Sequence, residues 1–321
     1  MRILLTGSNG QLGTEFRTLS RSTAEIISTG SRELDLTSEQ KIRRFVREVK
    51  PAVIVNAAGF SDVDAAERNW DACFALNAIA PVVLAEEAHR LDALLIHYST
   101  DQVFDGMKAG LYAETDPASP LNVYGASKLA GEEGIASSFA RALVLRLGWI
   151  YSARGENFLS SILRLAEHSD EVQVASDQMG TPTSAKAVAS ATERLIRMYA
   201  SSRKTQFPTG VYHLAASGAT SWHGFAVSAV SAAFRNSAMR GKRPPIVTPT
   251  VTAELSSFAK RPKNVLLSCQ KFLTTFGFQL GPWQQQLDEV LAEVASIRGA
   301  SSDGLDTPHR TGDLIGVDEA T

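Results

Sequence analysis

Short apolar runs alternate with longer amphipathic stretches through the first half of the chain. The runs are rich in Ile, Val and Leu and lack strict apolar–polar alternation, which is typical of strands with helices on both faces. They predict buried strands at residues 2–5, 25–28, 52–55, 93–97 and 143–147. The stretches between them predict helices at residues 11–20, 38–49, 71–90 and 124–137. This alternation predicts an α/β fold with a doubly wound parallel sheet.

The rhythm changes after about Trp149. Helices are expected at residues 157–167, 184–200 and 221–234, and strands at 171–174 and 210–214. Prolines at 244, 245, 249 and 262 predict extended loop rather than regular structure there. A last helix is expected from Pro282, a first-turn proline, to about Ile297.

The pattern therefore divides the chain into two unequal parts and a tail. We expect a first domain over residues 1–150, with part of 183–217 returning to it, and a smaller C-terminal lobe over 151–297. Residues 298–321 are small and polar with one short apolar patch, which predicts a flexible tail.

Charge and cysteine content exclude several classes of protein. The 32 basic and 34 acidic side chains leave a net charge of −2, without the clustered basic footprint that nucleic acid or an anionic membrane requires. The two cysteines, Cys73 and Cys269, lie far apart and support neither a disulfide framework nor a zinc ribbon. The six histidines have no metal-ligand spacing, so no metal is predicted. The apolar run at the start is too short for a signal peptide, and no run of 18 apolar residues occurs, so we expect a cytoplasmic protein.

A glycine-rich turn follows the first predicted strand, with Gly7, Gly10 and Gly13 in the spacing G-x-x-G-x-x-G. Glycines there let the backbone turn tightly and approach a diphosphate, whose charge lies at the N-terminus of the next helix. A tight strand-to-helix turn without a ligand is the alternative. Its position at the first strand, opening a helix, favours a dinucleotide site of the Rossmann type.

The ends of the second and third strands extend this prediction. Ser31 and Arg32 occupy the tip of the second strand, where an Arg suits the extra phosphate of NADP and an acidic residue would suit NAD. We therefore favour NADPH, with NADH possible and a plain surface arginine as the alternative reading of Arg32. Asp35 and Leu36 are expected beside the adenine. The small residues before Phe60, which include Ala58 and Gly59, leave room for the cofactor to cross the third strand.

Three residues predict the chemistry. Thr100 follows the fourth strand, and Tyr124 and Lys128 follow it at positions i and i+4 of a helix, hence on one helix face. A tyrosine with its ordinary pKa near about 10 is a poor acid or base at neutral pH, and a nearby ammonium brings that pKa towards the working range. The Thr100 hydroxyl can share the substrate oxygen. A Tyr-x-x-x-Lys pair alone occurs by chance in many helices, but this three-residue arrangement in register with the glycine turn does not.

At these residues the chain resembles the extended short-chain dehydrogenase/reductases, and within them the dTDP-4-dehydrorhamnose reductase family. The resemblance covers about residues 1–297. It rests on the strings TGSNGQLG from Thr6, NAAGFSDVDAAE from Asn56, STDQVFDG from Ser99, PLNVYGASKLAGE from Pro120, LRLGWIY from Leu145, GENF from Gly155, DQMGTPT from Asp177, GVYHLAASGATSW from Gly210 and RPKNVLL from Arg261.

The resemblance implies reduction of the C4 ketone of dTDP-4-dehydro-6-deoxy-L-mannose to dTDP-L-rhamnose with hydride from NADPH or NADH. Tyr124 would be the proton donor, Lys128 its partner and ribose contact, and Thr100 the tuning hydroxyl. Gly10, Gln11 and Leu12 would line the diphosphate turn, Asp35 and Leu36 the adenine, and Ala58, Gly59 and Phe60 the middle of the cofactor. Trp149 would contact the sugar nucleotide, with Asp101 and Gln102 beside Thr100 at the sugar site. We expect a monomer or homodimer.

Two positions depart from the family's strings, and they bear on the substrate. Gln102 stands where a tyrosine is common, and Gly148 where a serine precedes the tryptophan. Gln102 also argues against a 4,6-dehydratase, because an amide cannot accept the proton that a glutamate there would remove. A 4-epimerase fits the strings less well.

Two alternatives remain. One is a reductase for another nucleotide-linked 4-keto deoxysugar. The other is a non-catalytic regulatory subunit that resembles the partner of methionine adenosyltransferase, which the presence of Thr100, Tyr124 and Lys128 disfavours.

Overall fold

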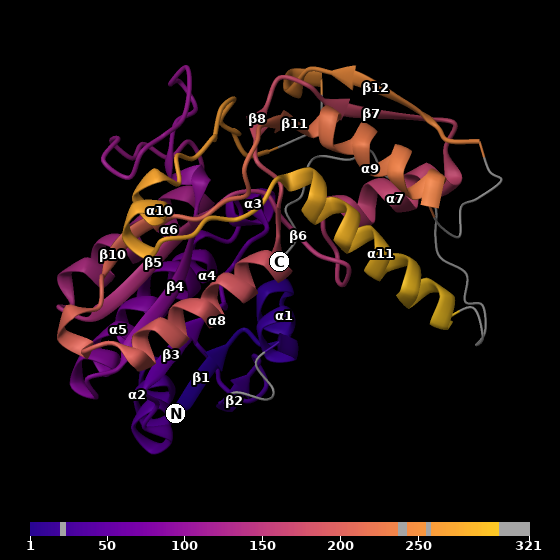
Figure 1. The fold of residues 1–321 in the computed structure, drawn as a ribbon. Coiled ribbons are helices and arrows are strands. Elements are labelled where there is room, and N and C mark those ends of the chain that lie inside the picture. Colours follow the sequence, from indigo (N-terminus) through magenta and orange to yellow (C-terminus); the bar gives the residue numbers. More distant parts are fainter. Residues whose placement is uncertain (20–23, 237–242, 255–257, 302–321) are drawn as a thin grey trace.

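A six-stranded parallel sheet forms the centre of the larger lobe in the computed structural model, which describes residues 1–19, 24–236, 243–254 and 258–301 (Figure 1). The strand order is β10-β5-β4-β3-β1-β2, so the predicted doubly wound parallel sheet is confirmed. The strands are β1 Arg2–Thr6, β2 Glu25–Thr29, β3 Val53–Asn56, β4 Leu94–Thr100, β5 Arg141–Leu147 and β10 Gly210–His213. The chain order reverses between β1 and β3, and in such sheets ligands bind outside the carboxyl ends of the strands at that point.

Helices cover both faces of this sheet, and alternate side chains of each strand serve opposite faces. Ile3 and Leu5 of β1 pack with Phe16 of α1, in the cluster that also contains α8. Leu4 between them packs with Ile42 of α2, in the cluster that contains α5 and α6. The helices are α1 Gln11–Leu19, α2 Glu39–Val49, α5 Ala80–Arg90, α6 Val123–Ser137 and α8 Ala185–Ser201. Each such large apolar side chain, when fully buried, contributes about 1.5–3 kcal/mol, which explains why most positions in these strands are apolar.

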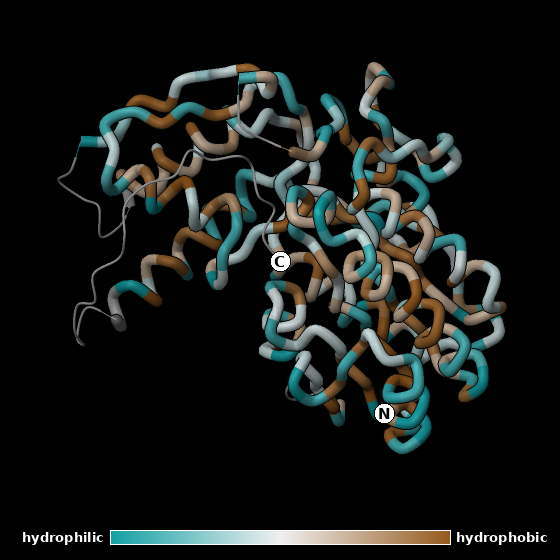
Figure 2. The backbone as a smooth tube through the Cα atoms, turned by 180° about the vertical axis from the view of Figure 1, so that it is seen from behind, coloured by the Kyte–Doolittle hydropathy of each residue, from teal (hydrophilic) through white to brown (hydrophobic). Residues whose placement is uncertain are grey.

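A smaller lobe lies beside the sheet, at the upper right of Figure 1. Its core joins three helices to short strands, with Tyr151, Phe225 and Trp283 among its buried aromatic residues. The elements are β6 Ile150–Tyr151, α7 Phe158–His168, β7 Glu171–Ala175, β8 Met179–Gly180, β9 Thr183–Ser184, β11 Thr220–Ser221, α9 Trp222–Asn236, β12 Ile246–Thr250 and α11 Trp283–Ser301. Figure 2 shows brown, hydrophobic stretches running through the interior of the larger lobe and teal ones on its outer turns.

The expectation of irregular loop around the prolines is wrong for one stretch. Ile246–Thr250 forms β12, which pairs in parallel with β7 although it contains Pro249. Only two strands make up that sheet, so β12 is an edge strand. Proline is tolerated on an edge because its missing N–H need not face a neighbour.

Two helices differ from the sequence expectation. The helix expected over 71–90 is divided into α4 (Trp70–Phe74), a π-helical turn η2 (Ala75–Ile79) and α5. The last helix, α11, continues to Ser301, so residues 298–301 do not belong to the expected tail. Arg298 in this last turn pairs with Glu167 of α7. The remainder of the tail, 302–321, lies outside the described residues.

The remaining described elements are short. They are α3 Val63–Ala66, η3 Asp101–Val103, η4 Lys204–Gln206, η5 Thr252–Glu254 and α10 Gln270–Phe276. Within the described ranges, none of the helices has both the length and the apolar character needed to span a membrane.

Candidate active site

The glycine turn between β1 and α1 is built for close backbone approach. Gly7 has φ +70°, and a Cβ there would lie 2.4 Å from the Ala58 nitrogen of the neighbouring strand end. A Cβ on Gly13 would lie 2.1 Å from the Gly7 carbonyl oxygen. Neither position accepts a side chain without moving backbone, and α1 begins at Gln11 directly after the turn. The turn and helix N-terminus therefore fit a dinucleotide diphosphate.

A cavity of about 500 Å³ opens at this edge of the sheet, within the size range of small-molecule sites. It collects residues from the first, second, third, fourth and fifth strands' carboxyl ends and from α6. Twelve residues predicted from the sequence line it: Gly7, Gly10, Gln11, Leu12, Asp35, Leu36, Ala58, Gly59, Thr100, Tyr124, Lys128 and Trp149.

Five of the predicted site residues do not line the cavity: Gly13, Arg32, Phe60, Asp101 and Gln102. Gly13 packs against the turn itself. Arg32 is exposed after the tip of β2, next to Ser31, which does line the cavity. Phe60 packs beside Tyr124 in a small apolar cluster.

At the adenine end, Asp35 is engaged by neighbouring side chains. Its carboxylate accepts hydrogen bonds from Lys41 Nζ at 2.8 Å and from the Thr37 hydroxyl at 2.6 Å. The bond from Lys41, with those from Thr37, lowers the pKa of Asp35 to about 2. Asp35 is therefore ionised at neutral pH while its charge is compensated by Lys41.

Tyr124 and Lys128 lie one turn apart on α6, and both are more than nine-tenths buried. Lys128 Nζ donates to the carbonyl oxygen of Tyr98 on β4 at 3.1 Å. Burial lowers the pKa of Lys128 to about 8, although Cys73 and Glu132 act in the opposite direction. A lysine with this pKa is still mostly charged at neutral pH, so it can stabilise a phenolate at Tyr124.

Thr100 ends β4 and fixes the loop that follows. Its Oγ1 accepts from the Gln102 backbone N–H at 3.2 Å and donates to Asp101 Oδ1 at 3.2 Å. The residue before it, Ser99, donates to Glu132 of α6 at 2.5 Å, and Glu132 forms a buried ion pair with Arg146 of β5 at 2.7 Å. These bonds hold the end of β4 against α6.

Asn122 is a functional residue that sequence reasoning did not identify. Its Oδ1 accepts from the Gly125 N–H at 2.7 Å and so caps α6 immediately before Tyr124. Its Nδ2 donates to Gln102 Oε1 at 2.8 Å and to the Lys260 carbonyl at 2.9 Å. An Asn directly before a helix is a recognisable N-cap signal. Gln102 thus contacts the cap of α6.

Asn77 in the π-helical turn η2 holds the loop after β3. Its Oδ1 accepts from the Phe60 N–H at 2.9 Å, and its Nδ2 donates to the Phe60 carbonyl at 2.8 Å and to Ser127 of α6 at 3.0 Å. Irregular helical turns of this kind occur often at functional sites. Here the turn places the Asn77 side chain between the loop at Phe60 and Ser127 of α6, so that one amide joins the two.

Trp149 borders the cavity on the side of the smaller lobe. It has φ +46°, a conformation that is uncommon for a residue with a large side chain. Its ring stacks on Trp222 with centroids 3.6 Å apart and an interplanar angle of 6°. A Cβ on Gly180 would lie 2.3 Å from the same ring. Trp149 is therefore held in one orientation by the smaller lobe.

Within the described ranges, no three His, Cys, Asp or Glu side chains come together in a group able to hold a metal ion. The donors around the cavity are instead backbone N–H groups, hydroxyls, amides and one ammonium. This donor set suits a dinucleotide and an oxygen-rich ligand.

Similarity to known proteins agrees with this geometry. The family described as RmlD substrate binding domain matches residues 1–296. A dTDP-4-dehydrorhamnose reductase of Burkholderia thailandensis is 40% identical over 303 residues, which cover 92% of this chain and 100% of that protein. A dTDP-4-dehydrorhamnose reductase of Escherichia coli is 34% identical over 298 residues, covering 92% and 98% of the two chains.

Solved structures show the same likeness. A dTDP-4-dehydrorhamnose reductase of Clostridium acetobutylicum superposes with a TM-score of 0.84 at 32% identity, covering 92% of this chain and 99% of that one. One of Bacillus anthracis, solved in complex with NADP, superposes with a TM-score of 0.82 at 30% identity, covering 91% and 99%. The chain belongs to the RmlD substrate binding domain family, the dTDP-4-dehydrorhamnose reductase family that its sequence strings indicate.

Proposed function

We propose that this chain is an NADPH- or NADH-dependent reductase that converts dTDP-4-dehydro-6-deoxy-L-mannose to dTDP-L-rhamnose. The observation that carries the proposal is the shared cavity: Thr100, Tyr124 and Lys128 line the same space as the glycine turn. The named relatives are dTDP-4-dehydrorhamnose reductases, and one was solved with NADP. The domain division expected from the sequence suits this role, with the sheet binding the cofactor and the smaller lobe the sugar nucleotide.

The bound nicotinamide would supply a hydride to the C4 carbonyl carbon of the sugar. Tyr124 donates the proton that the carbonyl oxygen needs, because its phenol is far more acidic than the Thr100 hydroxyl and Lys128 keeps its charge to stabilise the phenolate. Lys128, charged at neutral pH, stabilises the phenolate that remains and contacts the nicotinamide ribose. Thr100 shares the substrate oxygen by hydrogen bonding and fixes its position relative to Tyr124.

The rest of the site orients the two ligands. Gly7, Gly10 and the first turn of α1 hold the cofactor diphosphate, and Asp35 and Leu36 flank the adenine. Trp149, fixed by Trp222, offers a rigid aromatic wall to the sugar nucleotide. Arg32, exposed beside Ser31, supplies a charge for the 2′-phosphate of NADPH. We place the protein in the cytoplasm, as a monomer or homodimer, with Cys73 and Cys269 as free thiols.

The experiment that tests the function is direct. Purified protein is incubated with NADPH and dTDP-4-dehydro-6-deoxy-L-mannose made in situ, and cofactor oxidation and the sugar product are followed by absorbance and NMR. We expect stoichiometric NADPH oxidation and dTDP-L-rhamnose. A different hexose would identify another 4-keto sugar as the substrate, and bound cofactor without any turnover on such sugars would favour a non-catalytic subunit.

A further inference from the structure

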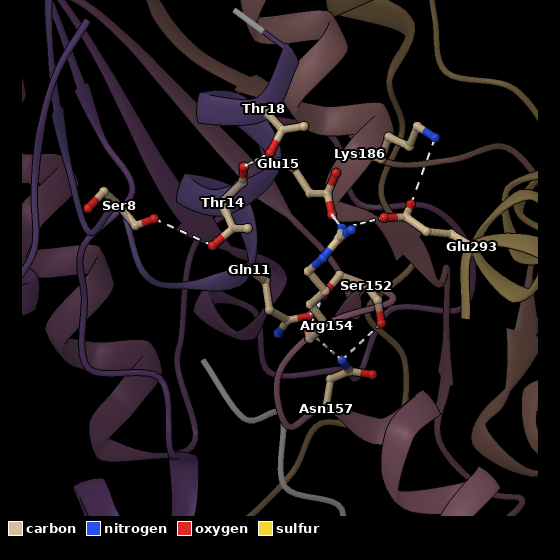
Figure 3. Close-up of polar contacts among 10 residues, drawn as sticks. All are labelled: Ser8, Gln11, Thr14, Glu15, Thr18, Ser152, Arg154, Asn157, Lys186 and Glu293. Carbon is tan, nitrogen blue, oxygen red and sulfur yellow. Dashed lines mark hydrogen bonds and ion pairs between the residues drawn. The ribbon is translucent and has the colours of Figure 1, made fainter. Parts of the chain in front are cut away.

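The loop between β6 and α7 contacts the first helix of the larger lobe at two points. Ser152 Oγ lies 3.0 Å from Gln11 Oε1, and Arg154 lies 3.7 Å from Glu15 (Figure 3). Gln11 and Glu15 are four residues apart on α1, so both lie on one face of that helix. Residues from the smaller lobe thus hold the helix whose N-terminus faces the cofactor site.

The loop is itself firmly fixed, which makes it a suitable support. The Ser152 hydroxyl also lies 2.6 Å from the Arg154 carbonyl. Asn157, which caps α7 and is 1% exposed, donates from Nδ2 to the Ser152 carbonyl at 3.1 Å. The single hydroxyl proton of Ser152 is shared between the Arg154 carbonyl and the Gln11 amide oxygen, and because the hydroxyl is buried, water does not compete for it.

The second contact belongs to a chain of alternating charges between the lobes. Arg154 lies between Glu15 of α1 and Glu293 of α11, and Lys186 of α8 lies 3.9 Å from Glu293. Figure 3 shows the guanidinium between the two carboxylates. Burial raises the pKa of Glu15, and Glu293 raises it further, whereas Arg154 and Lys186 lower it. Arg154 therefore favours the charged form of the nearly buried Glu15 carboxylate.

We propose that Ser152 and Arg154 are positioning residues for the cofactor site: Ser152 acts through Gln11 and Arg154 through Glu15 to fix the first turns of α1. Gln11 lines the cavity, and the backbone N–H groups of this turn are those that would face the diphosphate. The affinity for NADPH then depends on the contact between the two lobes. This inference rests on the proposed binding of NADPH in the cavity.

A double-mutant cycle on NADPH binding tests the role of Ser152. Dissociation constants are measured without sugar, by NADPH fluorescence, for the parent, Ser152→Ala, Gln11→Ala and the double variant. We expect Ser152→Ala to weaken binding about five- to tenfold, the value of a hydrogen bond in a buried setting. We expect no further loss when Ser152→Ala is added to Gln11→Ala, because the hydroxyl acts through that amide. Ser152→Thr, which keeps the hydroxyl, should restore most of the affinity.

The role of Arg154 is tested by a second set of NADPH-binding measurements with a matched control. Arg154→Met should weaken NADPH about two- to fivefold, a smaller effect because the guanidinium is half exposed. This loss should disappear in a Glu15→Gln background. The control is Arg164→Ala on α7, which removes the exposed partner of the loop residue Glu156. It should leave the dissociation constant for NADPH unchanged.

The two proposals fail differently. Additive losses in the Ser152 and Gln11 cycle, or NADPH affinity within twofold of the parent for Ser152→Ala, would overturn the positioning role while leaving the reductase proposal intact. A parent protein that binds neither NADPH nor NADH would overturn the proposed function and this inference with it.

Discussion

Burial makes the Lys128 ammonium unusually acidic, so turnover should depend on pH. Its pKa is lowered to about 8, chiefly by desolvation. In the proposed mechanism, reduction needs a charged Lys128 and a protonated Tyr124, so turnover at saturating substrates should decrease as the pH rises through about 8. The measurement is kcat against pH between 6 and 10. A turnover that stays level to pH 10 would separate Lys128 from the chemistry.

The same burial affects stability, and the sign can be worked out. Since the pKa of Lys128 is about 8 in the folded protein and 10.5 for an unperturbed lysine, the unfolded chain holds the proton more tightly between these values. Burial of the charge therefore destabilises the fold below pH 8, and the effect decreases as the pH rises towards 10.5. Lys128→Met should raise the free energy of unfolding at pH 7 by up to about 3 kcal/mol, while lowering turnover and NADPH affinity.

Tyr124 is the proposed proton donor, so loss of its hydroxyl should affect turnover and not cofactor binding. Tyr124→Phe should lower kcat by a factor on the order of 10² to 10⁴, the usual contribution of a positioned acid, with NADPH affinity largely kept. Tyr199→Phe removes the hydroxyl of a buried tyrosine on α8, which is not among the cavity residues, and should leave kcat near the parent value. Near-normal turnover in a folded Tyr124→Phe protein would assign the proton to another group.

Arg32 is exposed, so its role depends on the ligand. If it pairs with the 2′-phosphate, Arg32→Ala should weaken NADPH by about 1–3 kcal/mol, the strength of a charge-assisted hydrogen bond, and leave NADH nearly unaffected. Arg44→Ala, at another exposed cation on α2, is the control and should affect neither cofactor. Equal losses for NADPH and NADH at Arg32 would reduce this residue to a surface charge.

At the level of elements, the apolar runs predict the central strands well, because strands buried on both faces are apolar at nearly every position. β12 could not be predicted in this way, since it is short, contains Pro249 and exists only through pairing with β7, some 75 residues earlier. The division of the expected helix at 71–90 was also invisible in the periodicity. It depends on the Asn77 side chain meeting Phe60 and α6, which are tertiary contacts.

The catalytic helix α6 offers a test of how an N-cap serves a site. Asn122→Ala should lower the free energy of unfolding by about 0.5–2 kcal/mol, because the cap bond to Gly125 is lost. It should also lower kcat, since Tyr124 lies in the first turn of that helix and the bond to Gln102 is lost with the amide. Ser38 caps α2 and does not itself line the cavity, although its neighbour Thr37 does, so at saturating NADPH Ser38→Ala should lower stability and leave kcat near the parent value. An unchanged kcat for Asn122→Ala would restrict the cap to a structural role.

At the scale of the whole molecule, a parallel sheet explains why so much of the site could be predicted. Residues that follow successive strands meet at one edge, so Gly7, Ala58 and Thr100 were expected together from their positions alone. Contacts between the lobes could not be predicted in this way. Ser152 meets Gln11 from 141 residues away, and no spacing in the sequence encodes that approach.

Asp64 on α3 joins a late segment of the chain to the larger lobe. Its Oδ1 accepts from the N–H groups of Phe258 and Ala259 at 3.0 and 2.7 Å, and its Oδ2 pairs with Arg261 at 3.0 Å. Arg261 is nearly buried, with a side chain only 5% exposed. The carboxylate thus compensates a guanidinium removed from water, and the same segment supplies the Lys260 carbonyl that Asn122 contacts.

Asp64→Ala should therefore lower the free energy of unfolding by about 3–5 kcal/mol, the usual effect of removing one partner of a buried ion pair. Asp64→Asn should lower it less, since an amide oxygen still accepts the two backbone N–H groups. Glu156→Ala, which removes the exposed partner of Arg164, is the matched control and should cost less than about 1 kcal/mol. Urea unfolding at pH 7 gives the three values. If Asp64→Ala destabilises the protein no more than Glu156→Ala does, the segment around Arg261 is held by its other contacts, and the Asp64–Arg261 pair contributes no more than a surface ion pair.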